Sequence, residues 1–283
     1  MGILNVTPDS FYDGGTYGDE ERARARLDEL VRDGADIVDL GAESTRPGAP
    51  EVDAREQLAR LGSLVGRAVA AAPCVSVDTT LPEVAERVLR AGAHMVNSVS
   101  LEPAAELGRL CARHGATLVL THCRGRMSAM AGFSACAEDA YGDVVADVRR
   151  EWEAAAARAL GAGLAPSALV MDPGLGFTKS AAHSLELCAR LDELVGMGYP
   201  ILVGPSRKSF LAKVVADEAG IAAPAAADRL GASLAAALLC AARGARILRI
   251  HDVAATRQAL AYARALAKVR RPAAAETGGP ADA

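Results

Sequence analysis

The sequence predicts a single-domain α/β protein in which eight parallel strands alternate with eight helical stretches as a (β/α)8 barrel. Three observations lead to this expectation. Short apolar runs recur eight times along 283 residues, a longer helical stretch follows each run, and polar or glycine-rich clusters lie between them. One repeat takes about 35 residues, and such barrels take about 250 residues as a single domain. A doubly wound open sheet is the alternative with the same alternation.

The eight apolar runs have the character of buried parallel strands. They are short, rich in β-branched residues and mostly apolar rather than alternating, which is typical of strands covered on both faces. The expected strands are Gly2–Val6, Ile37–Leu40, Cys74–Val77, Met95–Val99, Thr117–Leu120, Leu169–Met171, Ile201–Val203 and Ile247–Ile250. The first run begins without any lead-in, which leaves room for a natural start upstream of Met1.

The stretches between these runs carry apolar residues at helical spacing, and most end near a glycine suited to a helix C-cap. The expected helices are Asp19–Val31, Asp53–Ala72, Pro82–Ala91, Pro103–His114, Tyr141–Ala162, Ala181–Met197, Phe210–Gly244 and Val253–Val269. Gly220 and Pro224 divide the seventh into two helices. We expect the barrel to span residues 1–270. The Pro/Ala/Gly-rich residues 271–283 are predicted to be a disordered tail.

The composition excludes several classes of protein. Lys and Arg number 31 against 35 Asp and Glu, a net charge of −4, which argues against broad nucleic-acid binding. No apolar run is long enough to span a membrane. Six cysteines without a CxxC pair predict reduced thiols and a cytoplasmic protein.

Polar residues follow every expected strand, where barrel enzymes carry their chemistry. Asp78, Asn97 and Asp172 follow the third, fourth and sixth strands and can converge at the barrel mouth. Two carboxylates and an amide there can accept hydrogen bonds from a flat heterocycle with several N–H donors. The alternative for Asp78 is that it caps the next helix.

A second group of polar residues suits an anion. Arg46, Arg249 and His251, together with Asn5, follow strands one, two and eight, which neighbour each other in a closed barrel. Arginine binds phosphate groups bidentately. Lys208 can bridge the two groups. The residues therefore predict an enzyme for a polar heterocycle that carries a phosphate or diphosphate.

Six stretches in the same order closely resemble the signatures of the dihydropteroate synthase family. They span nearly the whole chain, so the resemblance is specific; they are Met1–Gly15, Asp39–Ala49, Val75–Thr79, Asp172–Lys179, Pro205–Lys208 and Arg249–Val253. The resemblance implies a transferase that joins 6-hydroxymethyl-7,8-dihydropterin diphosphate to p-aminobenzoate, releasing pyrophosphate and forming 7,8-dihydropteroate for folate synthesis. It also implies a Mg2+ cofactor, a homodimer and inhibition by sulfonamides, which mimic p-aminobenzoate.

The resemblance also assigns roles to individual residues. Those implied to bind the pterin are Asp78, Asn97, Asp172 and Lys208, with Arg249 packed over the ring. Those implied to hold the diphosphate are Asn5, Arg46, Arg249 and His251, and Asn5 would also reach Mg2+. Those implied to line the p-aminobenzoate site are Thr45, Pro47, Phe177 and Ser206, between lids at Thr7–Gly15 and Glu43–Pro50. In the implied mechanism the diphosphate leaves first, while the catalytic residues Asp78, Asp172, Lys208 and Arg249 stabilise the charges that develop.

Three positions depart from the family pattern. Ser98 stands where these synthases usually have Asp, Thr121 where they have Met, and Tyr12 where they have Ser. The run around Ser98 is similar to methyltetrahydrofolate methyltransferases, which act with a corrinoid protein partner. Such a methyltransferase and a non-catalytic pterin-binding paralogue are therefore the alternative functions.

Overall fold

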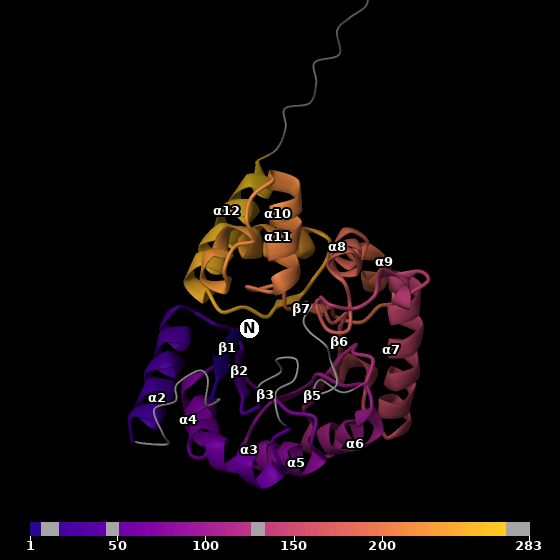
Figure 1. Cartoon of the computed structure of the whole chain (residues 1–283). Coiled ribbons are helices and arrows are strands. Elements are labelled where there is room, and N and C mark those ends of the chain that lie inside the picture. Colours follow the sequence, from indigo (N-terminus) through magenta and orange to yellow (C-terminus); the bar gives the residue numbers. More distant parts are fainter. Residues whose placement is uncertain (7–16, 44–50, 126–133, 270–283) are drawn as a thin grey trace, which may run out of the picture.

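The strands pair in chain order, and every pair is parallel. The computed structural model describes residues 1–6, 17–43, 51–125 and 134–269 (Figure 1). Within these ranges the strands are β1 (Gly2–Asn5), β2 (Val38–Gly41), β3 (Val75–Asp78), β4 (Met95–Ser98), β5 (Thr117–Thr121), β6 (Leu169–Asp172), β7 (Leu202–Val203) and β8 (Ile247–Leu248). Strands β1 to β6 form one sheet, and β7 pairs with β8.

Two single bridges join these sheets into a ring. Met171 pairs with Ile201 between β6 and β7, and Gly2 pairs with Ile250 between β1 and the segment after β8. The Ile3 amide donates to the Ile250 carbonyl at 3.0 Å, and the Ile250 amide donates to the Met1 carbonyl at 2.9 Å. The predicted (β/α)8 barrel is confirmed. The open-sheet alternative is wrong, because the first and last strands are hydrogen-bonded to each other.

Helices surround this ring of strands (Figure 1). In the described chain they are α2 (Tyr17–Arg32), α3 (Ala54–Leu61), α4 (Leu64–Ala71), α5 (Pro82–Arg90), α6 (Ala104–His114), α7 (Val144–Gly161), α8 (Ala181–Ala189), α9 (Leu191–Val195), α10 (Ser209–Ala219), α11 (Leu230–Ala242) and α12 (Val253–Lys268). Short 3-10 turns lie at Glu138–Ala140, Pro166–Ala168 and Ala226–Asp228. No helix in these ranges is long and apolar enough to cross a membrane.

Three helix predictions need correction. The stretch Asp53–Ala72 is two helices, because Gly62 takes a positive φ of 44° and closes α3. The stretch Ala181–Met197 also divides, at Arg190, into α8 and α9. Helix α7 begins at Val144 rather than Tyr141, because the Asp143 side chain accepts hydrogen bonds from the amides of the first turn. The predicted break in Phe210–Gly244 is confirmed.

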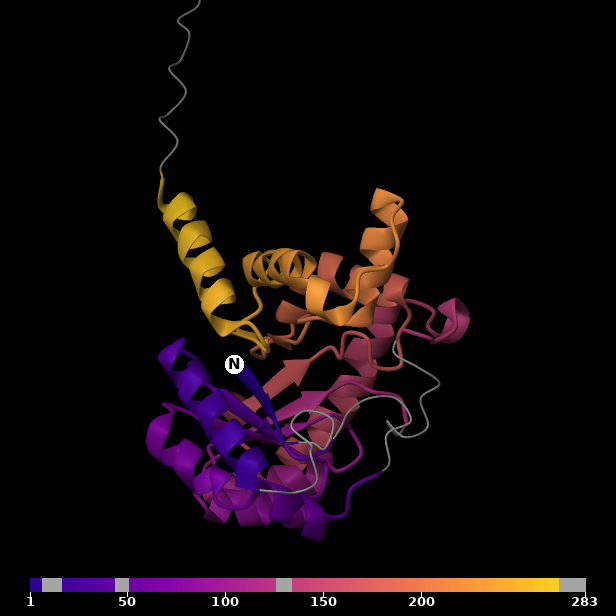
Figure 2. The same ribbon diagram turned by 60° about the vertical axis from the view of Figure 1, so that its left-hand side comes forward.

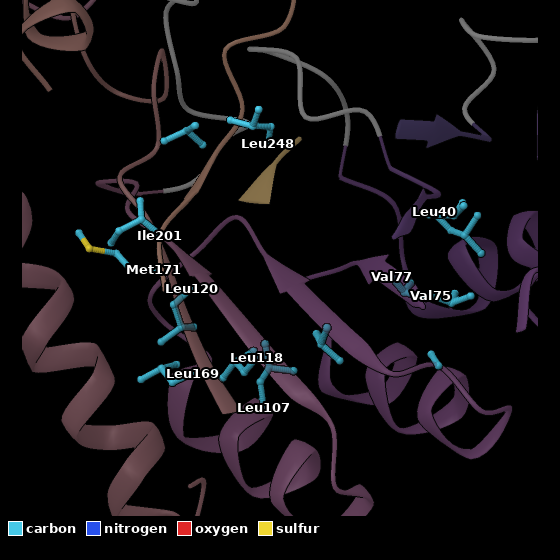
Figure 3. Packing of buried hydrophobic residues seen from close by; sticks show 14 of the residues in the cluster. Leu40, Val75, Val77, Leu107, Leu118, Leu120, Leu169, Met171, Ile201 and Leu248 are labelled. Atoms are coloured by element: carbon cyan, nitrogen blue, oxygen red, sulfur yellow. The ribbon is translucent and has the colours of Figure 1, made fainter. Parts of the chain in front are cut away.

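Strand side chains alternate between the helices and the barrel interior. The outward residues join one large apolar core; Figure 3 shows Leu118 and Leu120 of β5 and Leu169 of β6 near Leu107 of α6. A smaller interior cluster contains Met1, Met95, Val119, Val170 and Leu202. The inward residues at the opposite, C-terminal strand ends are polar. The interior of the barrel is thus apolar at one end and polar at the end where a reaction can take place.

Candidate active site

The alternation of side chains along each strand places the predicted polar residues at one mouth of the barrel. On β3 the outward side chains are Val75 and Val77, so Asp78 faces inward. The same alternation turns Asn97 inward on β4, and Asp172 inward at the end of β6. All three side chains are buried. The sequence-based expectation that these residues share the barrel mouth agrees with their positions.

Arg249, just after β8, connects this group. Its Nε donates to Oδ2 of Asp39 at 2.7 Å, and its Nη2 donates to Oδ2 of Asp78 at 2.9 Å. Asn97 also donates to Oδ2 of Asp39, at 3.3 Å. Burial disfavours the charge on Arg249, but Asp39 and Asp78 outweigh it and raise the pKa of the guanidinium. Two carboxylates thereby fix both the charge and the plane of Arg249.

The carboxyl group of Asp78 binds protons unusually well. Burial raises its pKa to about 7, although Arg249 opposes the shift; Asp39, Glu43 and Asp172 add to the rise by repulsion. The alternative role of Asp78 as a helix cap is wrong, because the N-cap position of α5 is Leu81. Asp78 can therefore change its protonation near neutral pH, where it faces the mouth.

Asp172 and Lys208 form a second acid–base pair of groups. The Nζ atom of Lys208 donates to the Leu175 carbonyl and lies 4.1 Å from the centre of the Phe177 ring. Burial lowers the pKa of Lys208 to about 8, and Asp172 opposes this shift. Burial raises the pKa of Asp172, against the attraction of Lys208 and a hydrogen bond from the Gly174 amide. The attraction between Asp172 and Lys208 thus opposes the effect of burial on both groups.

Ser206 and His251 are in direct contact. The His251 amide donates to Oγ of Ser206 at 3.1 Å, and the same Oγ lies 3.0 Å from the ring atom Nδ1. Burial lowers the pKa of His251 to about 4, so the ring is neutral at pH 7. If the hydroxyl proton goes to Nδ1, the ring proton sits on Nε2 as a hydrogen-bond donor. His251 would then hold an anion as a neutral donor rather than as a cation.

Asn5 reaches across the neighbouring strand. A Cβ atom placed on Gly41 of β2 would lie 2.8 Å from Oδ1 of Asn5 and 3.8 Å from Cβ of Asp78. The absence of a side chain at Gly41 therefore makes room for the Asn5 amide beside Asp78.

The rest of the expected site falls outside the described residues. Thr45, Arg46 and Pro47 are in this group, as are Tyr12, the lid Thr7–Gly15 and nearly all of the lid Glu43–Pro50. The base of the second lid is described. Glu43 accepts hydrogen bonds from the Val52 amide at 3.2 Å and from Gln57 at 2.9 Å. Glu43 thus ties together the two ends of the segment that carries Arg46.

The structure separates two of the departures from the family pattern. Ser98 follows the inward Asn97 and therefore points away from the barrel interior, where its hydroxyl donates to the Ser100 carbonyl at 2.8 Å. Its difference from the family therefore lies outside the barrel interior. Thr121 pairs with Asp172 across β5 and β6 and is buried. Thr121 is the departure that bears on the pocket.

Sequence reasoning missed two buried charged residues. Asp39 stands inside an apolar run, whereas the rule that places chemistry at strand ends points only to the residues that follow each strand; an acid in the middle of a buried strand was the available signal. Lys179 closes the Asp172–Lys179 stretch but had no role assigned to it, and it is fully buried. Asp39 contacts the predicted site residue Arg249, and Lys179 contacts the backbone carbonyl of the predicted site residue Phe177.

Comparisons with known proteins agree with this geometry. Residues 1–251 match the family described as pterin binding enzyme. The dihydropteroate synthase of Mycobacterium leprae is 43% identical over 263 residues, covering 92% of this chain and 90% of that protein. The structure of the Xanthomonas albilineans dihydropteroate synthase with 4-aminobenzoic acid is 40% identical, with a TM-score of 0.85, over 95% of this chain and 93% of that one.

A Yersinia pestis dihydropteroate synthase, solved as a complex with a sulfonamide drug, is also similar. It is 34% identical with a TM-score of 0.84, and the match covers 95% of this chain and 94% of that one. These relatives resemble the chain in both sequence and fold over nearly its full length. The chain belongs to the pterin-binding enzymes and, among them, to the dihydropteroate synthase family.

Proposed function

We propose that the protein condenses 6-hydroxymethyl-7,8-dihydropterin diphosphate with p-aminobenzoate to give 7,8-dihydropteroate and pyrophosphate, a step of folate biosynthesis. The observation that carries this proposal is Arg249 held between Asp39 and Asp78, with Asn97 bonded to the same Asp39. It places hydrogen-bond acceptors for a heterocycle directly beside a cation for a leaving group. The Xanthomonas relative was solved with 4-aminobenzoic acid, which supports the second substrate.

The reaction breaks one bond and forms another at the same carbon. The bond between the pterin methylene carbon and the diphosphate oxygen breaks with its electron pair on the oxygen, leaving a cationic pterin. The nitrogen lone pair of p-aminobenzoate forms the new bond to the methylene carbon, and the nitrogen then releases one proton to the solvent. This chain needs no nucleophile of its own; Asp78 and Asp172 stabilise positive charge on the pterin, and Arg249 stabilises the departing diphosphate.

Each predicted residue then has a task. We assign the pterin to Asp78, Asn97, Asp172 and Lys208, with Arg249 against its ring. The diphosphate falls to Asn5, Arg46, Arg249 and His251. The p-aminobenzoate site is assigned to Thr45, Pro47, Phe177 and Ser206. Lys208 supports the pterin and p-aminobenzoate assignments together, because it lies over the Phe177 ring and acts on the charge of Asp172.

The described residues fit a Mg2+ ion that arrives with the diphosphate. They contain no group of three or more His, Cys, Asp or Glu that could hold a metal. Asn5 offers a side-chain oxygen at the mouth, and Mg2+ commonly binds through one or two protein oxygens, substrate phosphates and water. Asn5 would hold the ion, which supplies charge neutralisation for the leaving pyrophosphate.

We also propose that the protein acts as a homodimer in the cytoplasm. All six cysteines are free thiols, which suits a reducing compartment. Apolar side chains lie exposed on neighbouring helices: Leu239 of α11, and Tyr262 and Leu266 of α12. Helix α12, yellow in Figure 2, projects from the barrel. This apolar surface supports a second copy of the chain as the partner.

The experiment that tests the function measures pyrophosphate release from the dihydropterin diphosphate in Mg2+ buffer, with and without p-aminobenzoate. We expect release that requires p-aminobenzoate and is inhibited by a sulfonamide. Pterin binding without turnover would contradict the synthase function and favour the non-catalytic paralogue. Methyl transfer from methyltetrahydrofolate to a corrinoid protein would instead favour the methyltransferase.

A further inference from the structure

Lys179 is a buried lysine whose amine group has three uncharged hydrogen-bond acceptors. Its side chain has no exposed surface. Its Nζ lies 2.9 Å from Nδ1 of His122, 3.1 Å from the His122 carbonyl oxygen and 3.1 Å from the Phe177 carbonyl oxygen. Three acceptors match the three protons of an ammonium group. Because a buried polar group is costly without hydrogen bonds, these three contacts hold the amine of Lys179 in one place.

The ring of His122 is fixed in the orientation that Lys179 requires. Its Nε2 lies 3.0 Å from Oε2 of Glu151 on α7, and Glu151 is also bonded to Arg124. A carboxylate accepts, so Nε2 carries the ring proton and Nδ1 presents its lone pair to Lys179. Burial lowers the pKa of His122 to about 3, and Lys179 adds to this shift; the ring is therefore neutral.

Lys179 joins two loops at the barrel mouth. One is the end of β5, which carries the His122 carbonyl; the other is the segment 173–179 between β6 and α8, which carries the Phe177 carbonyl. The loops are in close contact, since a Cβ on Gly174 would lie 2.0 Å from the His122 oxygen. Thr178, at a positive φ of 47°, adds a bond from the Arg124 amide to its Oγ1 at 3.0 Å.

The segment 173–179 delivers two groups to the site. Its Leu175 carbonyl accepts the hydrogen bond from Lys208, and its Phe177 ring lies beneath the same ammonium. Neither group reaches the site from a strand or a helix. Their positions depend on how the segment is tied to the barrel, and Lys179 contributes a fully buried tie to the carbonyl and ring of His122.

We propose that Lys179, through its bonds to His122 and Phe177, is a positioning residue that sets the place of Phe177 and the Leu175 carbonyl in the p-aminobenzoate half of the site. The inference rests on the proposed function, since that function assigns Phe177 to p-aminobenzoate. Of the residues assigned to the pterin, Asp78 and Asn97 lie on β3 and β4 and Arg249 follows β8, away from the segment 173–179. Asp172 and Lys208 do contact this segment, but Asp172 is held by β6 and Lys208 precedes α10. Loss of Lys179 should therefore weaken the binding of p-aminobenzoate much more than the binding of the dihydropterin diphosphate.

The kinetic test compares Lys179→Met with the wild type, measuring KM for each substrate and kcat. We expect KM for p-aminobenzoate to rise about 10- to 100-fold, while KM for the dihydropterin diphosphate changes less than about threefold. Lys213→Met is the matched control, because Lys213 is an exposed lysine paired with Asp217 on α10. Equal losses for both substrates, or none, would overturn the proposal.

Two variants of His122 keep the test sharp if Lys179→Met folds poorly. His122→Asn can retain an acceptor for Nζ near the place of Nδ1, whereas His122→Leu removes it. We expect His122→Leu to reproduce the p-aminobenzoate defect and His122→Asn to restore most of the wild-type KM. The same KM in both variants would show that the acceptor is irrelevant and would overturn the role of the bond.

Hydrogen exchange separates this inference from the proposed function. We expect the peptide covering residues 173–180 to exchange at least about tenfold faster in Lys179→Met, while peptides from β3 and β4 are unchanged. Absence of synthase turnover in the wild type would refute the proposed function without touching this result. Unchanged exchange in residues 173–180 would overturn the positioning role even in an active enzyme.

Discussion

Asp39 and Arg249, 210 residues apart in the sequence, form an ion pair of 2.7 Å at the centre of the barrel mouth. Asp39 has no exposed surface and accepts from Nε of Arg249, while Asp78 accepts from Nη2 of the same guanidinium. Removal of one partner of a buried ion pair strongly destabilises the folded protein, because the other charge stays buried without its partner. The pair therefore links the stability of the barrel to the arrangement of the site.

Asp39→Asn should separate orientation from substrate contact. The amide keeps the shape of the side chain but removes the negative charge beside Arg249. We therefore expect kcat/KM to fall about 10- to 100-fold, which is roughly 1.4 to 2.7 kcal/mol of transition-state stabilisation. The measurement is steady-state pyrophosphate release. Asp36→Asn is the control, since Asp36 is exposed and lies 3.7 Å from Arg257. An Asp39→Asn enzyme with wild-type kinetics would contradict the orienting role.

Pterin affinity should depend on pH through Asp78. Below its pKa of about 7 the carboxyl group is protonated and loses acceptor capacity, so affinity for 6-hydroxymethyl-7,8-dihydropterin should fall as the pH drops. We expect about a tenfold loss per pH unit below that value. Calorimetric titration between pH 5.5 and 8.5 measures the effect. The slope should disappear in Asp78→Asn, and a slope that persists there would assign the titration to another group.

Turnover should decline on the alkaline side through Lys208. Its pKa of about 8 means that the ammonium loses its proton, and with it the attraction to Asp172, as the pH rises past that value. Lys208→Arg keeps the charge at every accessible pH, so we expect its decline in kcat/KM to move above about pH 9. Rate profiles of the two proteins provide the test. A decline that stays near pH 8 in Lys208→Arg would assign the titration to another group.

Gly174→Ala should disrupt the site through a clash rather than through backbone strain. Gly174 has a φ of +71°, and an added Cβ would lie 2.0 Å from the His122 carbonyl oxygen. Gly163 also has a positive φ, of +103°, but nothing lies within 4 Å of an added Cβ. We expect Gly163→Ala to lower the free energy of unfolding by about 1–2 kcal/mol. Gly174→Ala should lower it by more and also abolish turnover; urea unfolding and pyrophosphate release report the two effects. Similar stability and activity in both variants would refute the clash.

The sequence predicted the barrel because the strands are short and mostly apolar and each connection between them is helical. Periodicity locates the elements, but it does not show where a long helical stretch is interrupted. The break at Gly62 needs only one residue with positive φ, and α9 follows α8 after a single residue, Arg190. Such interruptions depend on packing against neighbouring helices, which the pattern of apolar residues does not contain.

The site divides in the same way. Asp78, Asn97, Asp172 and Arg249 could be found because they follow strands, and strand ends meet at one mouth. Asp39 and Lys179 could not be found by that rule. Asp39 acts from inside a strand through a partner 210 residues away, and Lys179 acts through backbone carbonyls that leave no trace in the residue types. Buried charges are recognised by their partners, and partners are fixed by the fold.

The apolar surface on α11 and α12 should hold two copies of the chain together. Leu239, Tyr262 and Leu266 are 56%, 71% and 61% exposed, and such surface is unfavourable in water. We expect light scattering to give twice the chain mass of 29.1 kDa for the wild type and the single mass for the double variant Tyr262→Glu/Leu266→Glu. Leu185→Glu, at an exposed leucine of α8, is the control and should remain dimeric. A double variant that keeps the wild-type mass would place the interface elsewhere, whereas a wild type of single mass would refute the dimer.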